Sequence, residues 1–190
     1  VEILEHAYTI LTGDKIPYWK IKPAGIESGG AEEVRFCLMK SSPIVIEGET
    51  IIGVFDSDTS GIKNFNGLKG KGFVPWKNYT RVKKLNDLNI YGLKIPIPDF
   101  RSNYSKPEVE MNYFAIEHYF TNEMLNDLNM LKATSIPEIY KINDKSKAKK
   151  NFSKHIKSLK DPNVFKNFIE LFETIDDICL MKIDYYKLLD

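Results

Sequence analysis

The sequence contains few of the residues that disulfide frameworks and structural metal sites require. Its 190 residues include two cysteines and three histidines, and neither type is spaced as zinc ligands are. Cys37 and Cys179 lie far apart in apolar, helical contexts, so we expect two buried free thiols and no disulfide. We expect His6, His118 and His155 to be surface or packing residues.

Long apolar runs and nucleotide-binding loops are also missing. No stretch approaches the roughly 18 apolar residues that span a bilayer, and the first residues do not resemble a secretory signal. The G-x-x-x-x-G-K-[ST] pattern of a P-loop does not occur. We therefore expect a cytoplasmic protein without a membrane partner, and any ATP binding would have to lie elsewhere.

The overall charge is nearly balanced, but its distribution is uneven. The net charge is +1, which gives the whole molecule little attraction for nucleic acid. Lysines dominate residues 141–160, where Asp144 is the one acidic residue, and acidic residues become frequent after Asp161. The lysines could neutralise phosphates, although a solvated lysine-rich helix explains them equally well.

The most informative stretch is a hydrophobic run followed by two aspartates. Residues 51–55 read as a buried strand, and Asp56 and Asp58 follow it directly. Carboxylates at the carboxyl end of a strand are suited to a hard divalent cation such as Mg²⁺. Gly61 predicts a sharp turn around the ion. An acidic surface turn is the alternative interpretation.

Periodicity and breaker residues predict an α/β protein with a helical C-terminal appendage. We expect a core domain over residues 1–135 and a helical segment over 136–190, whose last helix is capped by Asp161 and Pro162. The expected helices cover 1–11, 31–39, 110–131, 145–159 and 163–189; the expected strands cover 17–22, 51–55 and 90–98, with a short apolar piece at 43–46 and a loop or insertion over 62–89.

Together these features resemble the Toprim domain of the OLD-family, ATPase-associated nucleases. The resemblance covers about the first 160 residues. It depends on the strand that ends in Asp-x-Asp-x-x-Gly at Asp56 and on the helix, strand and Gly-Gly unit before it. Two later stretches support it, Phe114-Ala115-Ile116-Glu117-His118-Tyr119-Phe120 and Lys149-Lys150-Asn151-Phe152-Ser153. It implies a Rossmannoid parallel sheet flanked by helices.

The resemblance also implies an activity and its residues. Asp56, Asp58 and Glu117 would bind Mg²⁺ or Mn²⁺, and Lys149, with Lys150 as its competitor, would stabilise negative charge in the transition state. The implied function is a DNA endonuclease module of a DNA-repair or phage-defence protein. Its expected partners are DNA, an ATPase domain or subunit in the same polypeptide or complex, and further copies in a homo-oligomer.

One departure from the family pattern matters. The family begins with a strand that ends in Val-Glu-Gly, whereas here Val1 and Glu2 already belong to the first helix. Either a longer polypeptide supplies this strand and its glutamate, or the chain is a non-catalytic scaffold that binds DNA or protein. In both cases we expect one edge of the 51–55 strand to lack a partner within this sequence. A phosphatase with Asp56 as nucleophile fits less well, because Ser60 and Gly61 stand where such loops carry threonine or valine.

An aromatic and basic group lies within the expected insertion. Trp76 and Tyr79 stand beside Lys77 and Arg81. Such a group could stack on unpaired bases, but we favour a loop that packs its aromatic rings on the body of the protein.

Overall fold

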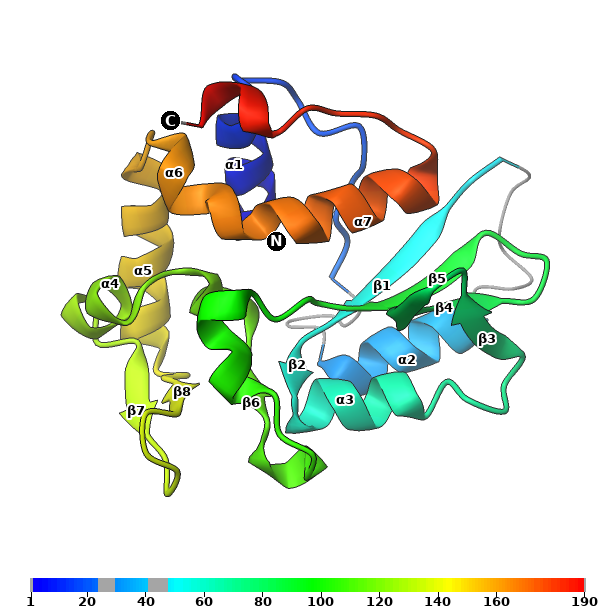
Figure 1. The fold of residues 1–190 in the computed structure, drawn as a ribbon, viewed down its shortest axis with the longest axis horizontal. Helices are drawn as coiled ribbons and strands as arrows, with labels where there is room; N and C mark the ends of the chain where they lie inside the picture. Colours follow the sequence, from blue (N-terminus) through cyan, green and yellow to red (C-terminus); the bar gives the residue numbers. More distant parts are fainter. Residues whose placement is uncertain (1, 24–29, 41–47, 190) are drawn as a thin grey trace. The chain divides into compact units, whose positions relative to one another are not determined.

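The computed structural model describes residues 2–23, 30–40 and 48–189 and divides into two compact units (Figure 1). Unit 1 combines Val1–Lys22 with Ile116–Asp190, and unit 2 is Pro23–Ala115. Because the first helix belongs with the C-terminal part of the chain, this division does not coincide with the expected boundary at residue 135. In the described part of the chain, no helix is long and apolar enough to cross a membrane.

Unit 2 is built on a mixed four-stranded sheet. Its order is β1 (Ile51–Phe55), β5 (Ile90–Lys94), β4 (Tyr79–Leu85) and β3 (Phe73–Trp76). β1 and β5 are parallel, and the other two pairings are antiparallel. The expectation of a parallel sheet is therefore wrong for this part, because the two-residue connection between β3 and β4 can only join antiparallel strands. Among the described residues β1 is an edge strand, so the expected edge of the 51–55 strand without a partner is present.

Two helices, α2 (Ala31–Lys40) and α3 (Thr59–Asn66), pack on the sheet and on each other (Figure 1). The close approach of α2 depends on Gly53 in β1. A Cβ atom there would lie 2.6 Å from Leu38 Cδ1, closer than packed carbon atoms allow. The buried core under these helices consists of Leu38, Phe55, Phe65, Leu68, Phe73, Leu85 and Ile90.

Short elements complete unit 2 beyond the carboxyl end of β1. The two residues of β2 (Ser57–Asp58) pair antiparallel with β6 (Tyr113–Phe114). Between β5 and β6 the chain forms two 3-10 helices, η1 (Asp99–Tyr104) and η2 (Val109–Met111). The β2–β6 pair thus ties the two predicted metal-binding aspartates to a segment that lies about 55 residues further along the sequence.

Unit 1 is mainly helical and has an aromatic core. Its elements are α1 (Glu2–Leu11), η3 (Ile116–Tyr119), α4 (Asn122–Asp127), β7 (Leu131–Ala133), β8 (Tyr140–Ile142), α5 (Ser146–Ser158), α6 (Pro162–Phe165), η4 (Lys166–Phe168), α7 (Ile169–Cys179) and η5 (Tyr186–Leu188). The rings of Phe120, Phe165 and Phe168 contact one another and are almost fully buried. α1 packs against α5 and α6, so both ends of the chain contribute to this core.

Several predicted elements are present with nearly the expected bounds. The helices expected over 1–11, 31–39 and 145–159 correspond to α1, α2 and α5, and the strands expected over 51–55 and 90–98 to β1 and β5. Asp161 caps α6 by accepting a hydrogen bond from the Asn163 amide, with Pro162 in the first turn, as expected. The short apolar piece at 43–46 lies outside the described residues.

Four other predictions about helices, strands and loops are wrong. Residues 17–22 form no strand, and Trp19 instead packs against Tyr8 and Phe172. Residues 62–89 hold α3, β3 and β4. Of the helix expected over 110–131, only α4 is α-helical, and Thr121 caps its start at the Met124 amide; η2, β6 and η3 take the place of the earlier part. The helix expected over 163–189 ends at Cys179, where Leu180 adopts a left-handed conformation.

The cysteines and histidines differ partly from expectation. Both cysteines are free thiols, but Cys37 is exposed and Cys179 is only half-buried. His118 is fully buried and its Nε2 lies 3.1 Å from the Tyr140 carbonyl oxygen. His6 packs edge-on against Phe165. These two histidines are packing residues, as expected.

Candidate functional site

Asp56 and Asp58 stand on either side of a buried serine at the carboxyl end of β1. Ser57 is 1% exposed, whereas both aspartates are half-buried. Side chains alternate along extended backbone, and Asp58 is extended at φ −94° and ψ 178°. The two carboxylates therefore emerge on the same side of the segment, away from Ser57. This is the arrangement that a shared cation requires.

The serine fixes this segment to the neighbouring strand. Its hydroxyl donates a hydrogen bond of 2.6 Å to the Ile95 carbonyl oxygen, just beyond β5. The Ile95 amide in turn donates to the Phe55 carbonyl oxygen at 2.9 Å. The carboxyl ends of the two parallel strands are thus linked immediately before and after Asp56. The backbone that carries the aspartates is held by buried hydrogen bonds.

Asp58 has a second, structural role as the cap of α3. Its Oδ1 accepts a hydrogen bond of 2.7 Å from the Gly61 amide, which satisfies one of the free donors at a helix start. Gly61 does not form the positive-φ turn that the sequence suggested; it lies inside α3. It must be glycine for another reason, because a Cβ atom would lie 2.0 Å from the Asp56 carbonyl oxygen.

A loop from η2 encloses the start of α3. The Thr59 amide donates to the Asn112 carbonyl oxygen at 2.9 Å, and the Thr59 hydroxyl lies 3.1 Å from the Val109 carbonyl oxygen. Buried Asn112 is itself fixed by its side-chain bonds to the backbone of Lys106 and Glu108. The amides of Thr59 and Gly61 therefore already donate hydrogen bonds within the protein. They are not available to bind a phosphate at the first turn of α3.

The donor set suits a hard divalent cation. Capping engages one oxygen of Asp58, while a carboxylate has further lone pairs on both oxygens for a metal. Asp56 and Asp58 could thus hold Mg²⁺ or Mn²⁺ through oxygen ligands. Among the described residues, no group of three or more His, Cys, Asp or Glu side chains is placed to bind a metal ion.

Glu117 and Lys149, the other two predicted site residues, lie in unit 1, whereas Asp56 and Asp58 lie in unit 2. Glu117 is on the short helix η3 instead of a long α-helix, and Lys149 is exposed on α5. Burial raises the pKa of the Glu117 carboxyl group, and the Lys149 charge opposes that shift. The two predicted site residues of unit 1 are thus close enough for the positive charge of Lys149 to act on the Glu117 carboxyl group. Lys150, the competitor of Lys149, is also exposed.

A group of lysines near the end of α3 escaped the sequence analysis. Lys83 on β4 donates a hydrogen bond of 2.8 Å to the Phe65 carbonyl oxygen. Burial lowers the pKa of Lys83, and the nearby charges of Lys69 and Lys94 lower it further. Burial also lowers the pKa of Lys94. The sequence contained no signal for this group, because Lys69 follows α3, Lys83 is on β4 and Lys94 is on β5, so that only folding brings the three together.

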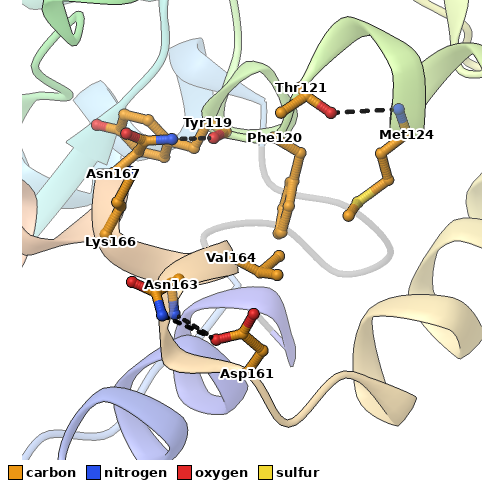
Figure 2. A pocket seen from close by; sticks show the side chains of 9 residues that line it. All are labelled: Tyr119, Phe120, Thr121, Met124, Asp161, Asn163, Val164, Lys166 and Asn167. Atoms are coloured by element: carbon orange, nitrogen blue, oxygen red, sulfur yellow. Dashed lines mark hydrogen bonds between the residues drawn. The ribbon is translucent and has the colours of Figure 1, made fainter. Parts of the chain in front are cut away.

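Unit 1 contains a hollow of about 280 Å³, shown in Figure 2. Phe120 and Val164 point into it, and the Asn167 side chain donates a hydrogen bond of 2.8 Å to the Tyr119 carbonyl oxygen at its edge. The lining consists of Tyr119, Phe120, Thr121, Met124, Asp161, Asn163, Val164, Lys166 and Asn167. None of the predicted site residues lines this hollow.

Comparisons of the chain with protein-family models, with curated proteins and with solved structures found no match.

Proposed function

We propose that this chain is a Toprim-like module that cleaves DNA with the help of Mg²⁺ or Mn²⁺. The observation that carries the proposal is the pair of carboxylates, Asp56 and Asp58, on one side of a rigid segment at the carboxyl end of β1. Ligand sites in open α/β sheets lie at this end of the strands. A bound divalent ion would neutralise phosphate oxygens and make a bound water more acidic.

The residues of the chain have separate tasks in this proposal. Asp56 and Asp58 hold the ion, and the Ser57 hydroxyl bond to Ile95 keeps them oriented. Glu117 adds a carboxyl group, whose pKa is raised by burial. Lys149 stabilises negative charge that develops on the phosphate. An ATPase domain or subunit and a homo-oligomer remain part of the proposal.

The test compares DNA cleavage by the wild-type chain and by Asp56→Asn and Asp58→Asn variants. Asparagine keeps the side-chain oxygen that caps α3 but removes the charge, so both variants should fold. We expect cleavage of plasmid DNA in Mn²⁺ or Mg²⁺ to fall by a factor on the order of 10³ or more, since the variants lose a ligand of the catalytic ion. Asp87→Asn, at an exposed position of the same unit, should cleave like the wild type.

An alanine at position 58 is a less suitable probe, because it also removes the cap on the Gly61 amide. We expect Asp58→Ala to lose about 1 kcal/mol of stability in addition to activity. Lys149→Ala should reduce the rate more than Lys150→Ala. Cleavage at the wild-type rate by Asp56→Asn would contradict the proposed metal site.

The alternative function is a non-catalytic scaffold that binds DNA or protein. One observation favours it: the cap on α3 gives Asp58 a structural purpose that needs no metal. The two functions differ in a direct measurement of Mn²⁺ binding by calorimetry. A scaffold binds DNA without Mn²⁺ affinity at Asp56, whereas the nuclease loses Mn²⁺ affinity when Asp56 becomes asparagine.

A further inference from the structure

The β3–β4 hairpin of unit 2 combines a strong local positive charge with ordered aromatic rings. Residues 67–98 contain six lysines and one arginine but a single acidic residue, Asp87, whereas the whole chain has a net charge of only +1. The tip of the hairpin is the two-residue turn Lys77-Asn78, and both of its residues are exposed. The hairpin and its surroundings thus form a strongly positive region, separate in sequence from the lysine-rich residues 141–160.

The rings at this tip form a preorganised stack. Trp76 and Tyr79 are opposite each other in the strand pairing, and their rings are nearly parallel, with centroids 5.7 Å apart and an interplanar angle of 8°. The Trp76 ring also meets Tyr91 of β5 edge-on, at 5.5 Å between centroids. This contact holds the indole in place while leaving it half-buried rather than covered. The rings therefore pack on the body of unit 2, as the sequence analysis expected, but they remain partly accessible to solvent.

Cations cover the faces of these rings. The Lys77 Nζ atom lies 4.2 Å from the centroid of Trp76, and Arg81 Cζ lies 5.2 Å from that of Tyr79. Lys84 lies over Tyr91 at 5.7 Å. An exposed lysine over an indole contributes at most about 1 kcal/mol, so a nucleobase can displace Lys77 from the Trp76 ring. The displaced ammonium group then remains beside the phosphate of that nucleotide.

Among the described residues, the lysines of this region have no acidic partners. In the described part of the chain, none of them forms an ion pair with a carboxylate, whereas Lys63 on α3 pairs with Glu110 at 2.9 Å. Lys69, Lys83 and Lys94 are close enough to one another that the pKa of Lys83 is lowered, first by burial and then by its two neighbours. A polyanion would relieve this repulsion. Lys77 and Lys84 lie over the rings of Trp76 and Tyr91 beside the stack, whereas Lys83 and Lys94 lie over the Phe65 ring of α3, on the other face of the sheet.

We propose that the β3–β4 hairpin binds single-stranded DNA, with unpaired bases stacking on Trp76 and Tyr79 and the surrounding lysines neutralising the phosphates. Stacking on an aromatic side chain requires a base whose face is free, which a duplex does not offer. The hairpin therefore selects single strands or locally opened duplexes. The inference deepens the proposed nuclease function, on which it rests, by naming the form of DNA that the module recognises.

The chain permits a direct optical test, because its two tryptophans are Trp19 and Trp76. A Trp19→Phe variant leaves Trp76 as the single indole fluorophore. We expect its emission to be quenched as a single-stranded oligothymidylate is added in the presence of EDTA, with much weaker binding to a duplex of the same length. Trp76→Leu in the wild-type background should weaken oligothymidylate binding on the order of 10-fold, measured by fluorescence anisotropy of labelled DNA.

Variants of charged residues separate the contribution of base stacking to DNA affinity from that of phosphate neutralisation. Lys77→Gln, at an exposed position, should fold normally and lower the slope of log affinity against log salt concentration by roughly 0.7. Tyr186→Leu, which removes an exposed ring in unit 1 (60% exposed), should bind like the wild type. Unchanged Trp76 emission on addition of DNA, or equal affinity for single-stranded and duplex DNA, would overturn the inference.

The design distinguishes this inference from the nuclease proposal. Binding is measured without divalent metal, so it does not depend on cleavage. Single-strand binding by a chain that never cleaves DNA would contradict the nuclease and leave the hairpin surface intact. Metal-dependent cleavage that survives Trp76→Leu with unchanged affinity for single strands would contradict the hairpin surface alone.

Discussion

At the scale of single residues, unit 1 contains a buried carboxylate near the C-terminus of the chain whose hydrogen-bond donor, Tyr18, lies near the N-terminus. Asp176 on α7 is 4% exposed and accepts a hydrogen bond of 2.7 Å from the Tyr18 hydroxyl. Burial raises the pKa of Asp176, while the hydrogen bond from the Tyr18 hydroxyl opposes that shift. Because the pKa is raised in the folded state, the carboxyl group favours folding when protonated and loses this contribution as the pH rises through its folded pKa.

Replacing Tyr18 by phenylalanine should therefore destabilise the protein in a pH-dependent way. The ring remains, but the charged carboxylate loses a donor, which should cost about 2 kcal/mol at pH 7. The loss should shrink as the pH falls through the folded pKa of Asp176, which burial raises above the ordinary value of an aspartate, because the carboxyl group then becomes protonated. Urea unfolding followed by circular dichroism at several pH values measures the effect, with Tyr186→Phe as the exposed control. An equal loss at all pH values would show that Asp176 is not the group responsible.

The residue scale also explains what could be predicted about the candidate site. Asp56 and Asp58 were placed correctly at the end of a strand, because a hydrophobic run followed by two acids is a local pattern. The cap on α3 was missed because Gly61 was interpreted as a turn residue, although aspartate is among the preferred residues at a helix start. The close approach of Gly61 to the Asp56 carbonyl oxygen depends on the folded backbone and leaves no mark in the sequence.

At the scale of elements, boundaries depend on single left-handed residues that are not glycine. Leu180 ends α7 with φ 57°, and Lys77 and Asn86 adopt φ 49° and 38° at turns next to β4. Glycine would have marked these positions in the sequence. Where strong local patterns exist, as in α1, α5 and β1, the sequence was sufficient to predict where the element begins and ends. Where a non-glycine residue in a left-handed conformation ends an element, the boundary depends on how the neighbouring segments pack. The sequence alone does not predict it.

Leu180 offers a test of this argument. Its side chain is 86% exposed, so its replacement loses little packing, and its left-handed backbone disfavours any residue with a Cβ atom. Leu180→Gly should therefore raise the free energy of unfolding by about 0.5–1 kcal/mol after the greater unfolded-state entropy of glycine is included. Met181→Gly, at the next position, should lower it. A thermal midpoint lower in Leu180→Gly than in the wild type would contradict the argument.

At the scale of the whole molecule, the chain enters unit 2 after Lys22 and returns to unit 1 at Ile116. The sequence did not indicate this arrangement, because α1 packs on helices more than 140 residues away and no linker composition marks the return to unit 1 at Ile116. The α/β class could be predicted, since it requires only the kinds of element present. The mixed sheet could not be predicted, because its antiparallel strands β3 and β4 lie in residues 62–89, which were interpreted as a loop.

Each unit has a core of its own, so a cavity in one core should weaken that unit selectively. Phe168 is fully buried among the rings of Phe120, Phe165 and Phe172 in unit 1, and Phe65 packs against Phe55 in unit 2. Phe168→Ala should cost about 3–5 kcal/mol locally, because the cavity removes contacts within one cooperative region. Hydrogen exchange measured by mass spectrometry should then accelerate in α5 and α7 while β1 and β5 keep their protection. Phe65→Ala is the reciprocal control and should expose β1 and β5 first. Equal loss of protection in both units from either variant would show that the chain opens as a single cooperative structure.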